Sequence, residues 1–241
     1  MRHGRRWSPI CLTASRENRA WRTVISGILH VLKTGCRWRD VPPANGPPTT
    51  IYNRYNRCSQ RRIWPRIFEK IAARRSRSRR AFHRQQPCQG APLGGCFKKG
   101  EFAEAIGRSR GGRTSQIHAL ADDRGSPVAF ALTPGNVADI TMAARLLGAV
   151  ARPKRLLADK AYDADSLRKW LKQRKVKAVV PSTASRRTPY PLDSRAYKRR
   201  NLIERMFCKL KNWRRIATRD DRYAQNYLSG LALAAIMIAW I

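Results

Sequence analysis

The sequence predicts an α/β fold, a mixed sheet flanked by helices, preceded by a small all-helical domain. Two observations lead to this prediction: apolar residues recur at helical spacing up to about residue 73, and strand-like and helix-like segments alternate after about residue 100. An alternating β-α-β-α order implies parallel pairing with helices on the sheet faces. We therefore expect a helical domain over 1–73, an aberrant basic linker over 74–100 and an α/β domain over 101–241.

The first region should contain three helices. Val24, Ile28 and Leu32 recur at helix spacing and Gly35 supplies a stop, while further helical stretches begin near Ile51 and Ile63. The size of this unit suits a helix-turn-helix module, and it carries several arginines, namely Arg54, Arg57, Arg61 and Arg62. A small helical bundle with a solvated basic face fits the same pattern equally well.

Residues 74–100 interrupt this pattern. The segment has no apolar periodicity and contains neither Asp nor Glu, so we expect that nothing in it packs as a central strand. The abrupt change in composition and the equally abrupt return near Lys98 indicate a frameshifted patch between two compensating insertions or deletions. Translation of the other two reading frames of the gene across residues 74–97 tests this interpretation, because one of them should encode an apolar strand containing Asp.

The second half should begin with a β-hairpin. Alternating apolar residues predict strands over 115–121 and 127–133, joined by a turn at 122–125. The remaining elements are expected in the order helix 139–150, strand 155–158, helix 165–174, strand 176–180, a basic helix over 197–215 and a buried apolar C-terminal helix.

The charge balance points to a polyanionic partner. The chain has 51 Lys and Arg against 15 Asp and Glu, a formal net charge of +36 that opposes a compact fold unless it is neutralised. Nucleic acid, bound mostly through its phosphates, is the obvious counter-charge. Charge of this kind identifies a partner but no reaction, and a basic ribosomal or nucleoid structural protein would share it.

The cysteines and the apolar tail exclude other classes. The six cysteines contain no C-x-x-C pair and no histidines at zinc-finger spacing, so we interpret them as reduced thiols in a cytoplasmic, nucleoid-associated protein. The apolar stretch 227–241 is too short for a membrane span and is predicted to be a buried helix.

Two carboxylates stand out as candidates for chemistry. Asp159 follows the apolar strand at 156–158, and ligands and catalytic groups gather at the C-terminal ends of parallel strands. Glu204 lies in the basic helix with Tyr197 and Lys211 seven residues to either side, so all three should share one stripe. A purely structural role remains open for each carboxylate: Asp159 can cap a turn, and Glu204 can form an i,i+4 surface ion pair with Arg200.

These residues carry a resemblance to a known family. The spacing Tyr197-x2-Arg200-x3-Glu204-x6-Lys211 resembles the Tyr-Arg-Glu-Lys signature of DDE transposases of bacterial insertion sequences, and segment 157–163 is similar to the strand that bears their second aspartate. Segments 32–43, 106–120 and 132–136 also resemble the family, so the likeness covers roughly 22–73 and 98–241.

The resemblance implies a ribonuclease-H-like catalytic core that cuts a transposon end and joins it to target DNA. Asp159 and Glu204 would be the catalytic residues and ligands of Mg²⁺ or Mn²⁺, since hard cations prefer oxygen ligands and two ions can neutralise the phosphoryl oxygens. Asp163 is interpreted as a helix N-cap. DNA contacts would come from a larger basic and aromatic set, Tyr197, Arg200, Lys211, Lys160, Arg54 and Arg57.

One element of the family pattern is missing. The family places its first aspartate on a strand within the interval that here spans 74–100, which has no acid. Two function classes follow: a transposase acting on transposon ends and target DNA, impaired by this loss, or a catalytically dead DNA-binding remnant or inhibitor. Either is expected to work as a homo-oligomer on double-stranded DNA, with no membrane partner.

Overall fold

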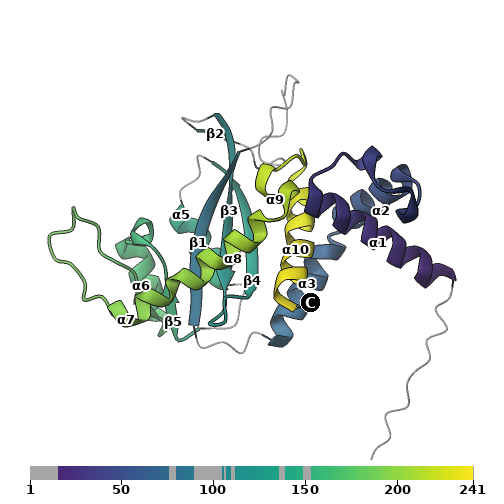
Figure 1. Ribbon diagram of the computed structural model, residues 1–241. Coiled ribbons are helices and arrows are strands. Elements are labelled where there is room, and N and C mark those ends of the chain that lie inside the picture. Colours follow the sequence, from purple (N-terminus) through teal and green to yellow (C-terminus); the bar gives the residue numbers. More distant parts are fainter. Residues whose placement is uncertain are drawn as a thin grey trace, which may run out of the picture.

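The computed structural model describes residues 16–75, 80–89, 105, 107–109, 112–135, 139–148 and 153–240 (Figure 1). Within these ranges a twisted sheet lies between two helical layers, and the N-terminal helices pack at one side of it. No helix in the described part of the chain is long and apolar enough to cross a membrane.

The sheet has the ribonuclease-H-like arrangement that the sequence predicts. Its main order is β4-β3-β1-β5-β6, in which β4, β3 and β1 pair antiparallel and β1, β5 and β6 pair parallel, while the short β2 pairs with the start of β3. The strands are β1 (Arg80–Gln89), β2 (Gly107–Ser109), β3 (Gly112–Ala121), β4 (Pro127–Pro134), β5 (Arg155–Leu157) and β6 (Lys177–Val179).

The central position of β1 corrects one expectation. Residues 80–89 were expected to lie in a linker with no central strand, but β1 pairs with β3 from Phe82↔Ala121 to Gln89↔Thr114, and with β5 on its other side. The ladder is made by backbone groups, which pair whatever the side chain except at Pro87, which has no N–H to donate, and tertiary pairing overrides weak β-propensity. The expectation was therefore wrong for this strand, while the rest of the proposed linker lies mostly outside the described residues.

The predicted hairpin is confirmed. β3 and β4 are joined by a turn in which Asp122 Oδ1 accepts hydrogen bonds from the backbone N–H groups of Arg124, at 3.0 Å, and Ser126, at 2.8 Å. Gly125 adopts φ +81°, a conformation open to glycine. The Asx-type turn at 122–125 thus sets the register of the two strands.

The predicted helices are present, except that the basic C-terminal helix is divided. The α-helices are α1 (Arg16–Thr34), α2 (Pro48–Gln60), α3 (Ile63–Arg75), α5 (Asp139–Gly148), α6 (Asp165–Gln173), α7 (Ser194–Tyr197), α8 (Asn201–Lys211), α9 (Arg214–Thr218) and α10 (Ala224–Trp240). Short 3-10 helices are η1 (Trp38–Asp40), η2 (Pro43–Asn45), η3 (Lys160–Tyr162) and η4 (Lys198–Arg200). The prediction of a single helix over 197–215 was wrong. The 3-10 helix η4 tightens the chain before α8, and Trp213 adopts an extended backbone after it, with its side chain buried.

The two sheet faces carry different cores. On one face, Phe82, Leu157 and Val179 pack with Ile203 and Phe207 of α8, which crosses the strands diagonally (Figure 1). On the other face, Leu156 of β5 and Ala158, just after it, pack under α5 and α6. Their neighbours in this core include Leu147, Leu167 and Leu171. This division follows from the alternation of side chains along a strand.

The N-terminal helices share their core with the C-terminal helix. Tyr55 Oη of α2 donates a hydrogen bond to the carbonyl oxygen of Asn226 in α10 at 2.5 Å. Gly230 permits the close approach, since a Cβ there would lie 3.0 Å from Leu32 Cδ2 and 3.1 Å from Tyr55 Oη. The apolar C-terminal helix is therefore buried as predicted, and it joins the helical region to the sheet.

Candidate active site on the face covered by α8

Asp159 ends the β5 segment and also caps the turn that follows. Its backbone is extended, with φ −82° and ψ 176°, and its Oδ1 accepts a hydrogen bond from the Ala161 N–H at 2.9 Å. Leu156 and Ala158 belong to the core under α5 and α6, whereas Leu157 belongs to the core under α8. Alternation therefore gives Asp159 the sheet face that α8 covers.

Glu204 lies in the first turn of α8 and forms the ion pair that was considered as its alternative role. Arg200 Nη2 donates to Glu204 Oε1 at 2.5 Å, and the Arg200 guanidinium lies 5.5 Å from the Tyr197 ring centroid. The neighbouring Ile203 is fully buried, which holds this carboxylate at the edge of the core as predicted. The stripe through Tyr197 is not one continuous α-helical face, because η4 intervenes.

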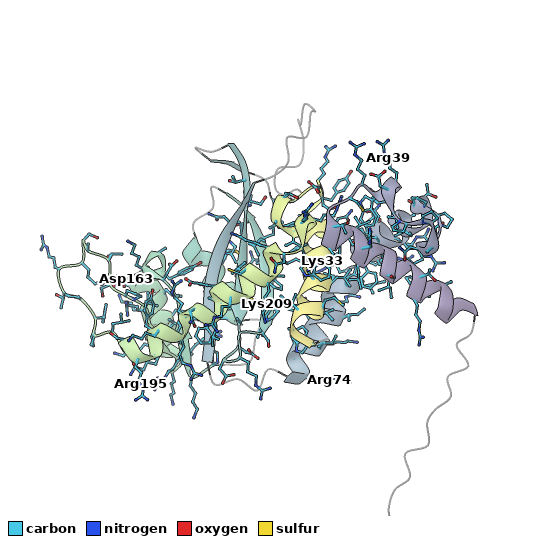
Figure 2. All side chains as sticks on the ribbon, viewed as in Figure 1. Lys33, Arg39, Arg74, Asp163, Arg195 and Lys209 are labelled. Atoms are coloured by element: carbon cyan, nitrogen blue, oxygen red, sulfur yellow. The ribbon has the colours of Figure 1, made fainter. Side chains whose placement is uncertain are left out.

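The two carboxylates come from elements that share one face of the sheet. Helix α8 contacts β1 and β3, and its apolar stripe packs with Leu157 next to Asp159. Figure 2 shows Arg195 on α7 at one end of this layer and Lys209 on α8 over the middle of the sheet. The arrangement meets the first requirement for a shared site, since neither carboxylate lies on the opposite face.

The residues predicted to contact DNA occupy two separate surfaces. Lys160, on η3, and Lys211, at the end of α8, are both exposed. Arg54 and Arg57 are instead on α2, where the Arg54 guanidinium lies 4.6 Å from the ring centroid of Trp21. The α2 arginines therefore lie on a different element from those that carry Asp159 and Glu204.

Asp163 is a structural anchor rather than the expected helix N-cap. The N-cap of α6 is Ala164, while the fully buried carboxylate of Asp163 accepts from Arg168 Nε at 2.7 Å, Thr183 N at 2.8 Å and Arg186 Nε at 3.0 Å. Burial alone would raise the pKa of this carboxyl, but the Thr183 N–H and the two guanidinium groups outweigh it and lower the pKa to about 2. Asp163 thereby fixes the loop that follows β6 (Figure 2).

We expect Asp163→Asn to destabilise the protein in a pH-dependent way. A carboxyl whose folded pKa is about 2, below its ordinary 3.8, stabilises the fold above pH 3.8, and this contribution is lost as pH falls through 2. The shift corresponds to about 2 kcal/mol, measurable by urea unfolding at pH 7. The loss should shrink at pH 3, whereas Asp165→Asn, at an exposed carboxylate paired with the same Arg186, should cost under about 1 kcal/mol. Equal losses for both variants at pH 7 would contradict the anchoring role.

Comparison with known proteins decides the family. Residues 76–237 match the model of the transposase DDE domain, and residues 3–68 match that of a putative transposase of the IS4/5 family. The chain is 36% identical over 129 residues to a putative transposase for insertion sequence element IS6501 from Brucella ovis, covering 53% of this chain and 98% of the relative. This chain belongs to the DDE transposase family.

Other relatives of this DDE transposase are more distant. A putative transposase for IS402 from Burkholderia cepacia is 32% identical over 137 residues, which is 52% of this chain and 63% of the relative. Two solved structures, a pre-cleavage Mos1 transpososome and a Mos1 paired-end complex with the left transposon end, give TM-scores of 0.31 and 0.30 at 10% and 13% identity. They cover 95% and 98% of this chain, and 81% and 79% of their own chains. Similarity at this level carries no argument about the site.

The transposase lacks a carboxylate on its central strand. The parallel register runs from Arg80↔Arg155 to Phe82↔Leu157, and its extension by two residues beyond the end of β5 would set position 84 level with Asp159. Phe82, at the end of this register, packs on the face covered by α8. The whole of β1 contains neither Asp nor Glu. The central strand next to β5 therefore offers no third carboxylate to accompany Asp159 and Glu204.

The residues present do not fit a pair of divalent ions. Asp159 and Glu204 supply the hard oxygen donors that Mg²⁺ prefers, but Glu204 is held by Arg200 and position 84 is cationic. Among the described residues, no group of three His, Cys, Asp or Glu side chains is placed to hold a metal ion. The use of divalent metal is a property of the family that this donor set does not support.

Sequence reasoning missed two features of the molecule. One is a buried ion pair between Arg215 and Asp221, and the other is a row of cations along α6. The second had a signal in the sequence, since Arg168, Lys169, Lys172, Lys175 and Lys177 fall within ten residues. The ion pair had none, because its partners become neighbours only through the turn after α9.

Proposed function

We propose that this transposase binds transposon-end DNA and that its metal-dependent strand cleavage and transfer are lost or severely impaired. The observation that supports this proposal is that β1, the central strand paired with β5 just before Asp159, contains neither Asp nor Glu. Attack on a phosphodiester requires neutralisation of charge on the phosphoryl oxygens. Two carboxylates, one of them paired with Arg200, leave too few ligands to hold two ions against their hydration.

The DNA-binding part of the proposal rests on surfaces that do not need metal. The net charge of +36 favours a polyanion, and Arg57 on α2 and Lys211 on α8 present exposed cations to solvent. Asp159, Glu204, Tyr197 and Arg200 remain our proposed remnants of the site at which the DNA strand would lie, with Lys160 beside them. In this state the chain acts as a DNA-binding remnant, which can occupy transposon ends without cutting them.

The two parts are tested by measuring binding and cleavage on the same end DNA. We expect salt-sensitive binding in EDTA and no cleavage with either Mg²⁺ or Mn²⁺. Arg54→Ala/Arg57→Ala should lower the salt slope of log K by up to about 2, because each phosphate contact contributes about 0.9. Lys70→Ala, at an exposed lysine of α3, should change it by no more than about 1. Cleavage that Glu204→Gln abolishes would show that the present site is active and would overturn the impairment.

A further inference from the structure

A basic groove runs along α6, between that helix, the start of β6 and the loop that ends at Pro191. Its volume is about 800 Å³, and its cations are Arg168, Lys169, Lys172, Lys175 and Lys177. The four lysines are exposed, and the one acidic residue of the lining, Asp165, is bound to Arg186 at 2.7 Å. Like charges gathered in this way repel one another, so the groove favours a polyanionic occupant.

The end of α6 places a lysine where glycine is usual. Lys175 N–H donates to the Lys172 carbonyl at 2.9 Å and Val176 N–H to the Leu171 carbonyl at 2.9 Å, which is the Schellman pattern. Lys175 consequently adopts φ +55°, a left-handed conformation that is unfavourable for a residue with a Cβ. This turn ends α6 and places Lys175 in the lining of the groove.

The wall opposite α6 is held in place by internal contacts. Tyr190, which is 45% exposed, lies under the guanidinium groups of Arg168, at 4.1 Å, and Arg186, at 5.0 Å. Arg186 is tied to the buried Asp163, and Ser182 Oγ accepts a hydrogen bond from the Tyr190 N–H at 2.9 Å. The groove is therefore formed before any ligand arrives, which reduces the entropic cost of binding.

The groove extends from Arg168, which binds Asp163 and the Val180 carbonyl, toward Lys177 at the opposite end of the strands. Lys177 pairs with Arg155 at the start of the parallel strands, whereas Asp159 follows their other end. Helix α6 has nine residues and is therefore about 14 Å long. Phosphates of one strand rise about 3.4 Å per nucleotide along the duplex axis, so a groove of this length parallel to that axis would span about four of them.

We infer that the groove along α6 binds the sugar–phosphate backbone of DNA, as a second contact separate from Asp159 and Glu204. Lysines on flexible stems suit a row of phosphates, and five of the residues that line the groove are cations. This inference rests on the proposed DNA-binding function and extends it to a further stretch of the duplex. It requires no cleavage, so it can be tested on the chain as it exists.

The first test is the salt dependence of duplex binding in EDTA. The triple variant Lys169→Gln/Lys172→Gln/Lys177→Gln should lower the slope of log K against log salt by up to about 3. The matched control is Arg66→Gln/Lys70→Gln/Arg74→Gln, which removes three exposed cations from α3. A groove variant whose slope changes no more than that of the control would overturn the inference.

The second test separates binding from folding. Lys175→Asn removes the charge but tolerates the left-handed conformation, so its melting temperature should equal or exceed that of the unmodified chain while its DNA affinity falls. An unchanged DNA affinity of the Lys175→Asn variant would overturn the inference. So would a variant that no longer binds poly-glutamate, an acidic polypeptide, but still binds DNA as the unmodified chain does. If the unmodified chain itself fails to bind DNA at low salt, the proposed function has failed, whereas binding that is indifferent to groove variants rejects the groove alone.

Discussion

Arg84→Asp is expected to restore to this transposase the metal-dependent strand cleavage that we propose is lost or severely impaired in the unmodified chain. By extension of the register of β1 against β5, which ends at Phe82↔Leu157, we expect position 84 to lie level with Asp159. The substitution replaces a cation with an oxygen ligand, so that three carboxylates would be available to bind the metal ions. Metal-assisted neutralisation of phosphoryl charge is worth several kcal/mol, so a gain of at least about a hundredfold in cleavage of end DNA is expected.

The matched control for this gain is Arg80→Asp. It makes the same change of charge on the same strand, but position 80 lies level with Arg155 at the opposite end of β5. This variant should not cleave, and Glu204→Gln should abolish the activity that Arg84→Asp confers. A folded, DNA-binding Arg84→Asp variant that stays inactive with both Mg²⁺ and Mn²⁺ would show that Asp159 and Glu204 do not form the site.

Asp221→Asn is expected to destabilise the fold by about 3–5 kcal/mol, the usual cost of leaving a buried charge unpaired. Arg215 Nη2 lies 3.2 Å from Asp221 Oδ1 and Nε lies 3.3 Å from Oδ2, and both side chains are less than a tenth exposed. The Arg215 guanidinium also lies 5.2 Å from the Trp38 ring centroid, so the pair joins α9 to the N-terminal helices. Urea unfolding at pH 7 measures the loss.

Two further variants isolate the cause. Asp220→Asn removes a carboxylate that lies 3.8 Å from the same guanidinium but is a third exposed, and it should cost under about 1 kcal/mol. The double change Arg215→Met/Asp221→Leu removes both charges and should recover most of the stability, as buried pairs replaced by apolar residues often do. A double variant as unstable as Asp221→Asn would mean that packing, and not the unpaired charge, sets the cost.

The elements that could be predicted are those with a strong local pattern. Helix α2 and the β3–β4 hairpin carry clear apolar periodicity and turn residues such as Asp122 and Gly125. Asp159 was recognisable because it directly follows a short apolar strand, and Glu204 because its spacing from Tyr197, Arg200 and Lys211 resembles the family signature. The assignment of Asp163 as a helix cap failed, since its partners Thr183 and Arg186 are about twenty residues away.

Local residue patterns, read from the sequence by itself, determined the charge, the helices, the hairpin and the two candidate carboxylates of this protein. Only the tertiary structure decided that the basic, proline-containing segment 80–89 is the central strand, because its ladder partners lie in β3 and β5, more than twenty residues away. The same holds for the division of the basic helix at Trp213 and for the groove along α6. These features depend on pairing and packing between distant segments, which local propensity does not encode.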